Sequence, residues 1–124
     1  MKKLAILLMF CFGIIGTSMS QQIHQVRIDA QKEFLVDQIK SGGFELFFNI
    51  NADASEIRRN AKFYESYFDV LYDESNGSCR IVFKDESQMS RRVVERFLLS
   101  NNISQVIIGE EAHTIEGFLN LFLN

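Results

Sequence analysis

The chain has 124 residues, of which 13 are basic and 16 acidic, so its net charge at pH 7 is −3. This length suits one domain with a single hydrophobic core. The slightly acidic balance, with arginines dispersed rather than clustered, excludes the usual electrostatic footprint of a nucleic-acid-binding protein.

The chain begins with the pattern of a secretory signal peptide. Lys2 and Lys3 form a basic start, residues 4–15 are an apolar run, and residues 18–20 place serines where a signal peptidase reads small side chains. The apolar run is shorter than the roughly 20 residues that a permanent membrane helix needs. We predict that residues 1–20 are removed, that no membrane span is retained, and that the mature protein, with a net charge of −5, is periplasmic or secreted.

Residues 21–43 are predicted to be an N-terminal helical extension. Apolar side chains recur there at helical spacing in two stripes, which are Ile23, Val26, Ala30 and Phe34, and Ile28, Leu35 and Ile39. Gly42 and Gly43 then provide a stop and a hinge before the main domain.

The main domain is predicted over residues 44–109, and it starts with a strand and a helix. Side chains alternate over residues 44–50, as in a half-buried strand. Asp53 can cap a helix, because Glu56 stands three residues later and can reach back to the cap. The helix would carry one apolar stripe made of Ile57, Ala61, Tyr64 and Phe68.

A hairpin, a second helix and a last strand follow. Asn76 and Gly77 mark a turn between strands at 70–72 and 79–83, because both residues tolerate positive φ. An amphipathic helix is predicted from Ser87 to about residue 99. Residues 105–108 are a short apolar run of strand type, and residues 110–124 are predicted to hold a C-terminal helix capped by Thr114.

This order of elements predicts an α+β fold of the ferredoxin-like βαββαβ type. The expected sheet is antiparallel, has four strands in the order 4-1-3-2, and carries two helices on one face, with helical extensions at both ends of the chain. The other face would present Glu45, Phe47, Asn49, Arg80, Val82 and Lys84. Either terminal segment would cover that face, or it would stay open.

The residues offer little support for an enzyme, so we predict a non-catalytic protein. The two histidines, His24 and His113, lie in opposite terminal extensions, and no Gly-x-Ser-x-Gly elbow is present. Cys11 lies within the predicted signal peptide, which leaves Cys79 as the one mature cysteine. Its place in an alternating strand predicts a buried thiol, although a lone exported cysteine also suits cross-linking or ligand binding.

The predicted βαββαβ order resembles the heavy-metal-associated domains of copper chaperones and transporters. That family carries Met-x-Cys-x-x-Cys in the turn after the first strand, whereas residues 49–54 here read Asn-Ile-Asn-Ala-Asp-Ala. The resemblance therefore implies the fold alone and transfers no metal ligand or other cofactor. RNA-recognition modules share the topology, but Ser78 and Arg80 stand where their third strand carries stacking aromatics.

We predict a small exported protein-interaction module, binding another protein or a second copy of itself. Phe47 and Val82 are the candidate interaction surface, because they would form an apolar centre on the open side of the sheet. The alternative is a periplasmic metal or small-ligand carrier, which would have to bring Cys79, His24, His113 or Met89 together.

Overall fold

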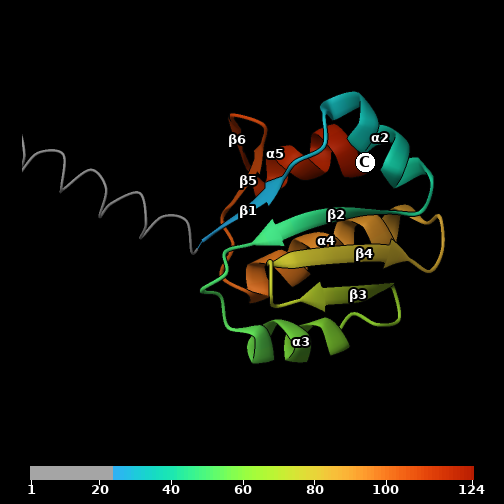
Figure 1. The fold of residues 1–124 in the computed structure, drawn as a ribbon. Coiled ribbons are helices and arrows are strands. Elements are labelled where there is room, and N and C mark those ends of the chain that lie inside the picture. The colour runs from blue at the N-terminus through green and yellow to red at the C-terminus, as the bar shows by residue number, and fades with distance from the viewer. Residues whose placement is uncertain (1–23) are drawn as a thin grey trace, which may run out of the picture.

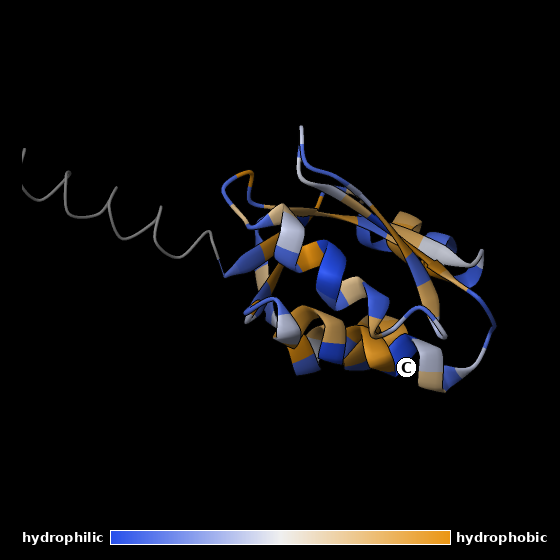
Figure 2. Ribbon diagram, turned by 90° about the horizontal axis from the view of Figure 1, so that it is seen from below, coloured by the Kyte–Doolittle hydropathy of each residue, from blue (hydrophilic) through white to orange (hydrophobic). Residues whose placement is uncertain are grey.

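The computed structural model describes residues 24–124. The fold has two layers, a mixed sheet of six strands and a set of helices that cover one of its faces (Figures 1 and 2). The strands are β1 (Gln25–Ile28), β2 (Gly43–Phe48), β3 (Phe68–Asp73), β4 (Ser78–Phe83), β5 (Gln105–Ile108) and β6 (Glu111–Thr114). The helices are α2 (Lys32–Lys40), α3 (Ala54–Lys62), α4 (Gln88–Ser100), α5 (Ile115–Phe118) and the π-helix η1 (Leu119–Leu123).

The sheet has the order β3-β4-β2-β1-β5-β6. β1 pairs in parallel with β5, and every other neighbouring pair is antiparallel. The predicted antiparallel, four-stranded ferredoxin-like sheet is therefore wrong. The four strands foreseen do occur in the expected relative order, but β1 lies between β2 and β5, and β6 is added at the edge beyond β5.

The error arose in the first described segment, where the helical extension was expected to begin. Val26 and Ile28 are fully buried and alternate with the polar Gln25 and Arg27, which is the period of a strand. Four residues give too short a pattern to outweigh the helical spacing that Val26 also shares with Ala30. Helix α2 does occur, but it starts only at Lys32, and the other apolar stripe correctly places Leu35 and Ile39 on its buried side.

Capping residues define where three of the helices begin. Asp53 accepts a hydrogen bond from the backbone N–H of Glu56 at 3.2 Å, and Ser87 accepts one from Ser90 at the same distance. Thr114 accepts from Gly117 at 3.0 Å. The predicted caps at Asp53 and Thr114 are thus confirmed, and each satisfies a backbone donor that has no partner within its helix.

The hairpin between β3 and β4 is longer than the two-residue minimum, as expected. Its backbone closes with the N–H of Gly77 donating to Asp73 O at 2.9 Å. Gly77 has a φ of 79°, but Asn76 does not have positive φ, so only one of the two predicted turn residues uses the left-handed region. Asn76 instead accepts a hydrogen bond from the N–H of Ser78 at 2.9 Å through its side chain.

The core between the sheet and the helices is rich in aromatic side chains. The ring of Phe97 on α4 lies 6.0 Å from Phe68, 6.2 Å from Tyr64 and 6.4 Å from Phe48, measured between ring centroids. All three pairs have edge-to-face geometry, which aromatic rings prefer over direct stacking. Phe97 thus ties α4 to β2, to β3 and to the segment that follows α3.

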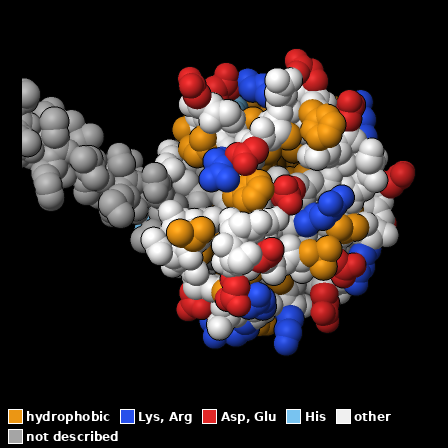
Figure 3. Space-filling model, in the orientation of Figure 1, with side chains coloured by type: hydrophobic (Ala, Val, Ile, Leu, Met, Phe, Trp, Pro, Cys, Tyr) orange, Lys and Arg blue, Asp and Glu red, His pale blue; other side chains and the backbone are white. Residues whose placement is uncertain are grey.

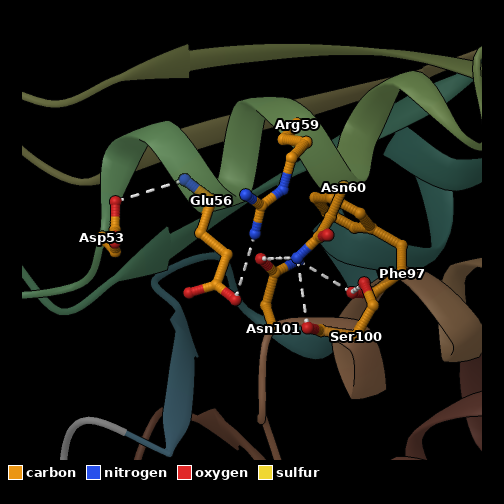
Figure 4. Close-up of polar contacts among 7 residues, drawn as sticks. All are labelled: Asp53, Glu56, Arg59, Asn60, Phe97, Ser100 and Asn101. Atoms are coloured by element: carbon orange, nitrogen blue, oxygen red, sulfur yellow. Dashed lines mark hydrogen bonds and ion pairs between the residues drawn. The ribbon is translucent and has the colours of Figure 1, made fainter.

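A polar contact joins α3 to the end of α4 (Figure 4). The amide nitrogen of the buried Asn60 donates to Ser100 O at 3.1 Å and to Asn101 Oδ1 at 3.0 Å. Asn101 in turn donates to Phe97 O at 2.8 Å, so its side chain closes the C-terminal turn of α4. This contact fixes α3 against the C-terminal end of α4.

Candidate interaction surface

The sheet has one face that no described helix covers. The side chains of β1 to β5 that point away from the helices form what we call the open sheet face, which contains Gln25, Arg27, Glu45, Phe47, Asp69, Leu71, Asp73, Ser78, Arg80, Val82, Gln105 and Ile107. In Figure 1, α4 lies behind β2 and β4, and both terminal helical segments join its layer, because η1 contacts α2 and α4. Figure 3 shows the open sheet face with hydrophobic side chains set among charged ones.

Phe47 lies near the end of β2 and is half-buried. Its direct neighbours across the sheet are Ser78 on β4 and Arg27 on β1. The guanidinium carbon of Arg27 lies 4.8 Å from the centroid of the Phe47 ring, a cation–π contact. Arg27 is also held by Asp29 at 2.6 Å, and this hydrogen bond raises the pKa of Arg27 above its ordinary value. One face of the Phe47 ring is therefore covered by the positively charged guanidinium of Arg27.

Val82 lies at the other end of the same face and is 36% exposed. It is paired with Gly43 on one side and Asp69 on the other. Because Gly43 has no side chain, the residue of β2 that pairs with Val82 places no side chain beside it. Asp69 forms an ion pair with Lys84 at 3.5 Å.

Leu71 is the most exposed apolar side chain on this face, at 60%. It pairs with Arg80, which in turn pairs with Glu45 on β2. Glu45 accepts a hydrogen bond from the Ser78 hydroxyl at 2.8 Å. The polar pair of Arg80 and Glu45 on the two central strands separates Phe47 from Val82, so the surface consists of apolar spots divided by charges rather than one apolar patch.

A groove of about 880 Å³ continues from this face around the outer edge of β3. Its walls are the β3 side chains and one side of α3, including Arg58, Ala61 and Lys62. The Arg58 guanidinium lies 5.5 Å from the Tyr72 ring centroid, and partial burial raises the pKa of the Tyr72 phenol. The lining of the groove therefore combines aliphatic, aromatic and charged side chains.

At the far end of β3, Asp73 organises the hairpin. Its carboxylate accepts hydrogen bonds from the Ser75 hydroxyl at 2.6 Å and from the Ser75 backbone N–H at 3.0 Å. These bonds favour the charged form and lower the pKa of Asp73. This end of the open sheet face thus carries a stable negative charge.

The sequence placed Phe47 and Val82 on one face and correctly assigned Glu45 and Arg80 to it, because period-two alternation decides which side chains share a face. It missed Arg27 and Ile107. Arg27 belonged to a segment that was expected to be helical, and the side chains of the short strand at residues 105–108 were not assigned to a face. In the structure, buried Val106 and Ile108 alternate with half-buried Gln105 and Ile107, whereas in the sequence only the polar Gln105 marks the open side of this apolar run.

The possible ligands of a metal carrier are not brought together. Cys79 is fully buried on the helix side of β4, and His113 lies on β6, four strands away in the sheet order. Adjacent strands are about 4.8 Å apart, so these residues are separated by roughly 19 Å. His24 contacts Asn102 O at 3.0 Å through Nδ1, and Met89 is exposed on α4. Within residues 24–124, no three His, Cys, Asp or Glu side chains are arranged to hold a metal ion.

The prediction that Cys79 is a core thiol is confirmed. Burial, with a smaller contribution from Glu45, raises the pKa of the thiol from 9.0 to about 12. We therefore expect iodoacetamide at pH 8 to leave Cys79 unlabelled in the native protein and to label it fully in denaturant, which mass spectrometry of the peptide that contains Cys79 will show. Rapid labelling without denaturant would contradict the burial.

The same thiol predicts how stability depends on pH. The folded state holds this proton up to about pH 12, whereas the unfolded chain loses it near pH 9. The contribution of the thiol to stability is thus complete below pH 9 and is lost as the pH rises toward 12. In denaturant titrations, a Cys79→Ala variant should lack this part of the alkaline decline.

Among the described residues no helix is both long and apolar enough to cross a membrane. The predicted signal peptide, residues 1–20, lies outside the described part of the chain. Comparison of the chain with family models, curated proteins and solved structures gave no match. These comparisons neither support nor refute the resemblance to heavy-metal-associated domains.

Proposed function

We propose that this protein is an exported, non-catalytic protein-interaction module that binds its partner through the open sheet face. The observation that carries the proposal is that this face is left uncovered by every described helix while it exposes Leu71 and Val82 and holds Phe47 half-buried. The apolar spots lie among charged side chains, a composition that suits a surface which must stay soluble when unbound.

The arrangement of charges supports recognition of a specific partner. Arg27 lies over Phe47, and Glu45 and Arg80 are direct neighbours across β2 and β4. Charges fixed beside apolar contacts select the orientation of a partner, because a misplaced partner would leave them facing like charges or buried without a counter-charge.

Substitution on the two faces of the molecule tests the proposal. In quantitative affinity capture from the cell of origin, Val82→Lys and Phe47→Glu are expected to reduce recovery of a specific partner at least tenfold, because each places a charge in the contact. Met89→Lys is the matched control, since Met89 is 62% exposed on α4 in the opposite layer. Each variant must retain the circular dichroism and thermal midpoint of the unsubstituted protein.

The pattern of loss decides the outcome. A partner that is lost with both open-face variants and kept with Met89→Lys supports the proposal. A partner that is kept with both open-face variants and lost with Met89→Lys would instead place binding on the helical layer and refute it.

A further inference from the structure

The outer edge of β3 has backbone groups that no neighbouring strand pairs. β3 is the first strand in the sheet order, so β4 is its only strand neighbour. The N–H of Lys84 donates to Tyr67 O at 3.1 Å, whereas the N–H of Phe83 donates to Gly42 O on the β2 side. The backbone N–H and C=O groups of Lys84, which follows β4, and of every second residue before it, starting with Val82, therefore point toward β3.

This register decides which groups of β3 point outward. Val82 pairs with Asp69 and Arg80 with Leu71, so the backbone groups of Asp69 and Leu71 are directed at β4. Those of Val70 and Tyr72 consequently point to the free edge. An edge of this kind is the structural feature that binds extended peptides as an added strand.

The groove described above runs along this edge. It is lined on one side by β3 and on the other by α3, whose Ala61 and Lys62 contribute to the wall. The Asn60 contact with Ser100 and Asn101 holds α3 in place. The side chains on one face of an added strand would thus lie over the open sheet face, and those on its other face would lie in the groove beside α3.

The charge pattern of β3 indicates what kind of segment would bind. Its open-face side chains are Asp69, Leu71 and Asp73, in the order acidic, apolar, acidic. A second copy of the chain, paired antiparallel about Leu71, would bring Asp69 opposite Asp73 and so place like charges together twice. A segment with a basic residue at each end and an apolar residue between them would instead form two opposite-charge pairs and one apolar pair.

We propose that the free edge of β3 binds an extended protein segment as an additional strand, and that this segment has the pattern basic-x-apolar-x-basic. The inference rests on the proposed interaction function and names the chemistry of its partner. Backbone hydrogen bonds to Val70 and Tyr72 would provide the pairing, and Asp69, Leu71 and Asp73 would select the sequence.

A synthetic peptide tests this directly. The probe is the C-terminally amidated peptide Thr-Lys-Thr-Val-Thr-Lys-Thr with a fluorophore on its N-terminal amine, titrated into the purified chain and followed by fluorescence anisotropy. We expect saturable binding and slower amide hydrogen exchange at Val70 and Tyr72. Replacing both lysines of the peptide by glutamate should weaken binding at least tenfold, and so should N-methylation of the two threonines that flank the valine, because it removes the donors that face the strand.

A matched protein variant checks the charge argument. Asp69→Asn with Asp73→Asn keeps the side-chain shapes and the acceptor oxygen that binds Ser75, so the hairpin should persist. This double variant should lose most of the preference for the lysine peptide over the glutamate peptide. An unchanged preference would overturn the proposed selectivity.

The outcomes separate this inference from the proposed function. Absence of peptide binding, equal binding of the N-methylated peptide, or protection of Val70 and Tyr72 caused by dimerisation would each overturn edge pairing. The proposed function would still stand if Val82→Lys and Phe47→Glu abolish capture of the partner. It would fail if those variants capture normally, whatever the peptide does.

Discussion

Replacing Gly77 by alanine is expected to destabilise the domain by about 3–5 kcal/mol. A Cβ atom built at this position would lie 2.2 Å from Phe48 O, which is backbone and cannot move aside as a side chain would. The positive φ of 79° adds a further cost of about 1–2 kcal/mol for a residue with a Cβ. The clash would also strain the hydrogen bond from the Phe48 N–H to Gly77 O, which is 2.8 Å long and joins the hairpin to β2.

Gly109 supplies the control for this prediction. Its φ is also positive, at 63°, but nothing lies within 4 Å of the place that a Cβ would take. Gly109→Ala should therefore cost only about 1–2 kcal/mol. Equilibrium urea denaturation of both variants measures the difference, and equal losses would contradict the close approach of the hairpin to β2.

Truncating Phe97 to alanine is expected to cost about 3–5 kcal/mol. Its ring is fully buried and contacts Phe48, Tyr64 and Phe68, so the substitution removes apolar contacts and leaves a cavity where the sheet meets α4. Phe63→Ala is the matched control, because that ring is 75% exposed and its loss should change stability by less than about 0.5 kcal/mol. Similar losses for the two variants would show that Phe97 is not central to the core.

Much of the fold was predictable because local patterns extend over enough residues. Residues 44–50 gave several alternations and Asp53 gave a cap with a clear chemical reason, so β2 and the start of α3 were expected close to where they occur, although β2 ends at Phe48. The predicted order of four strands was wrong as a whole sheet, because β1 lies between β2 and β5, but the relative order of those four strands does follow from the sequence of strands and helices. These features depend on side-chain period and capping, which neighbouring residues determine.

The remaining strands depend on contacts between distant parts of the chain. β1 and β6 have four residues each, and β1 is a strand because β2 and β5 supply hydrogen-bonding partners on both of its sides. Nothing near Val26 in the sequence indicates that residues 105–108 will lie beside it. A ferredoxin-like sheet was the simplest arrangement of the stronger elements, and the inserted strand changed its topology.

The sequence predicted that certain residues share the open sheet face, but it did not predict how they are arranged on that face. Phe47 and Val82 do share the open sheet face, yet the pairing of Glu45 with Arg80 separates them, which only the strand register reveals. Arg27 lies over Phe47 because β1 is next to β2, so this contact was missed with the strand itself. Asn60 was missed too, because a polar residue within a helix gives no sequence signal of a buried partner 40 residues away.

Site-specific photo-cross-linking in living cells tests most directly whether the open sheet face is the binding surface. A benzophenone amino acid is placed at Val82 in one strain and at Met89 in another, and the adducts formed on illumination are compared. The proposal predicts a discrete adduct with one partner protein at Val82, little or none at Met89, and loss of the Val82 adduct when Phe47→Glu is added. An adduct that forms at Met89 and not at Val82 would contradict it.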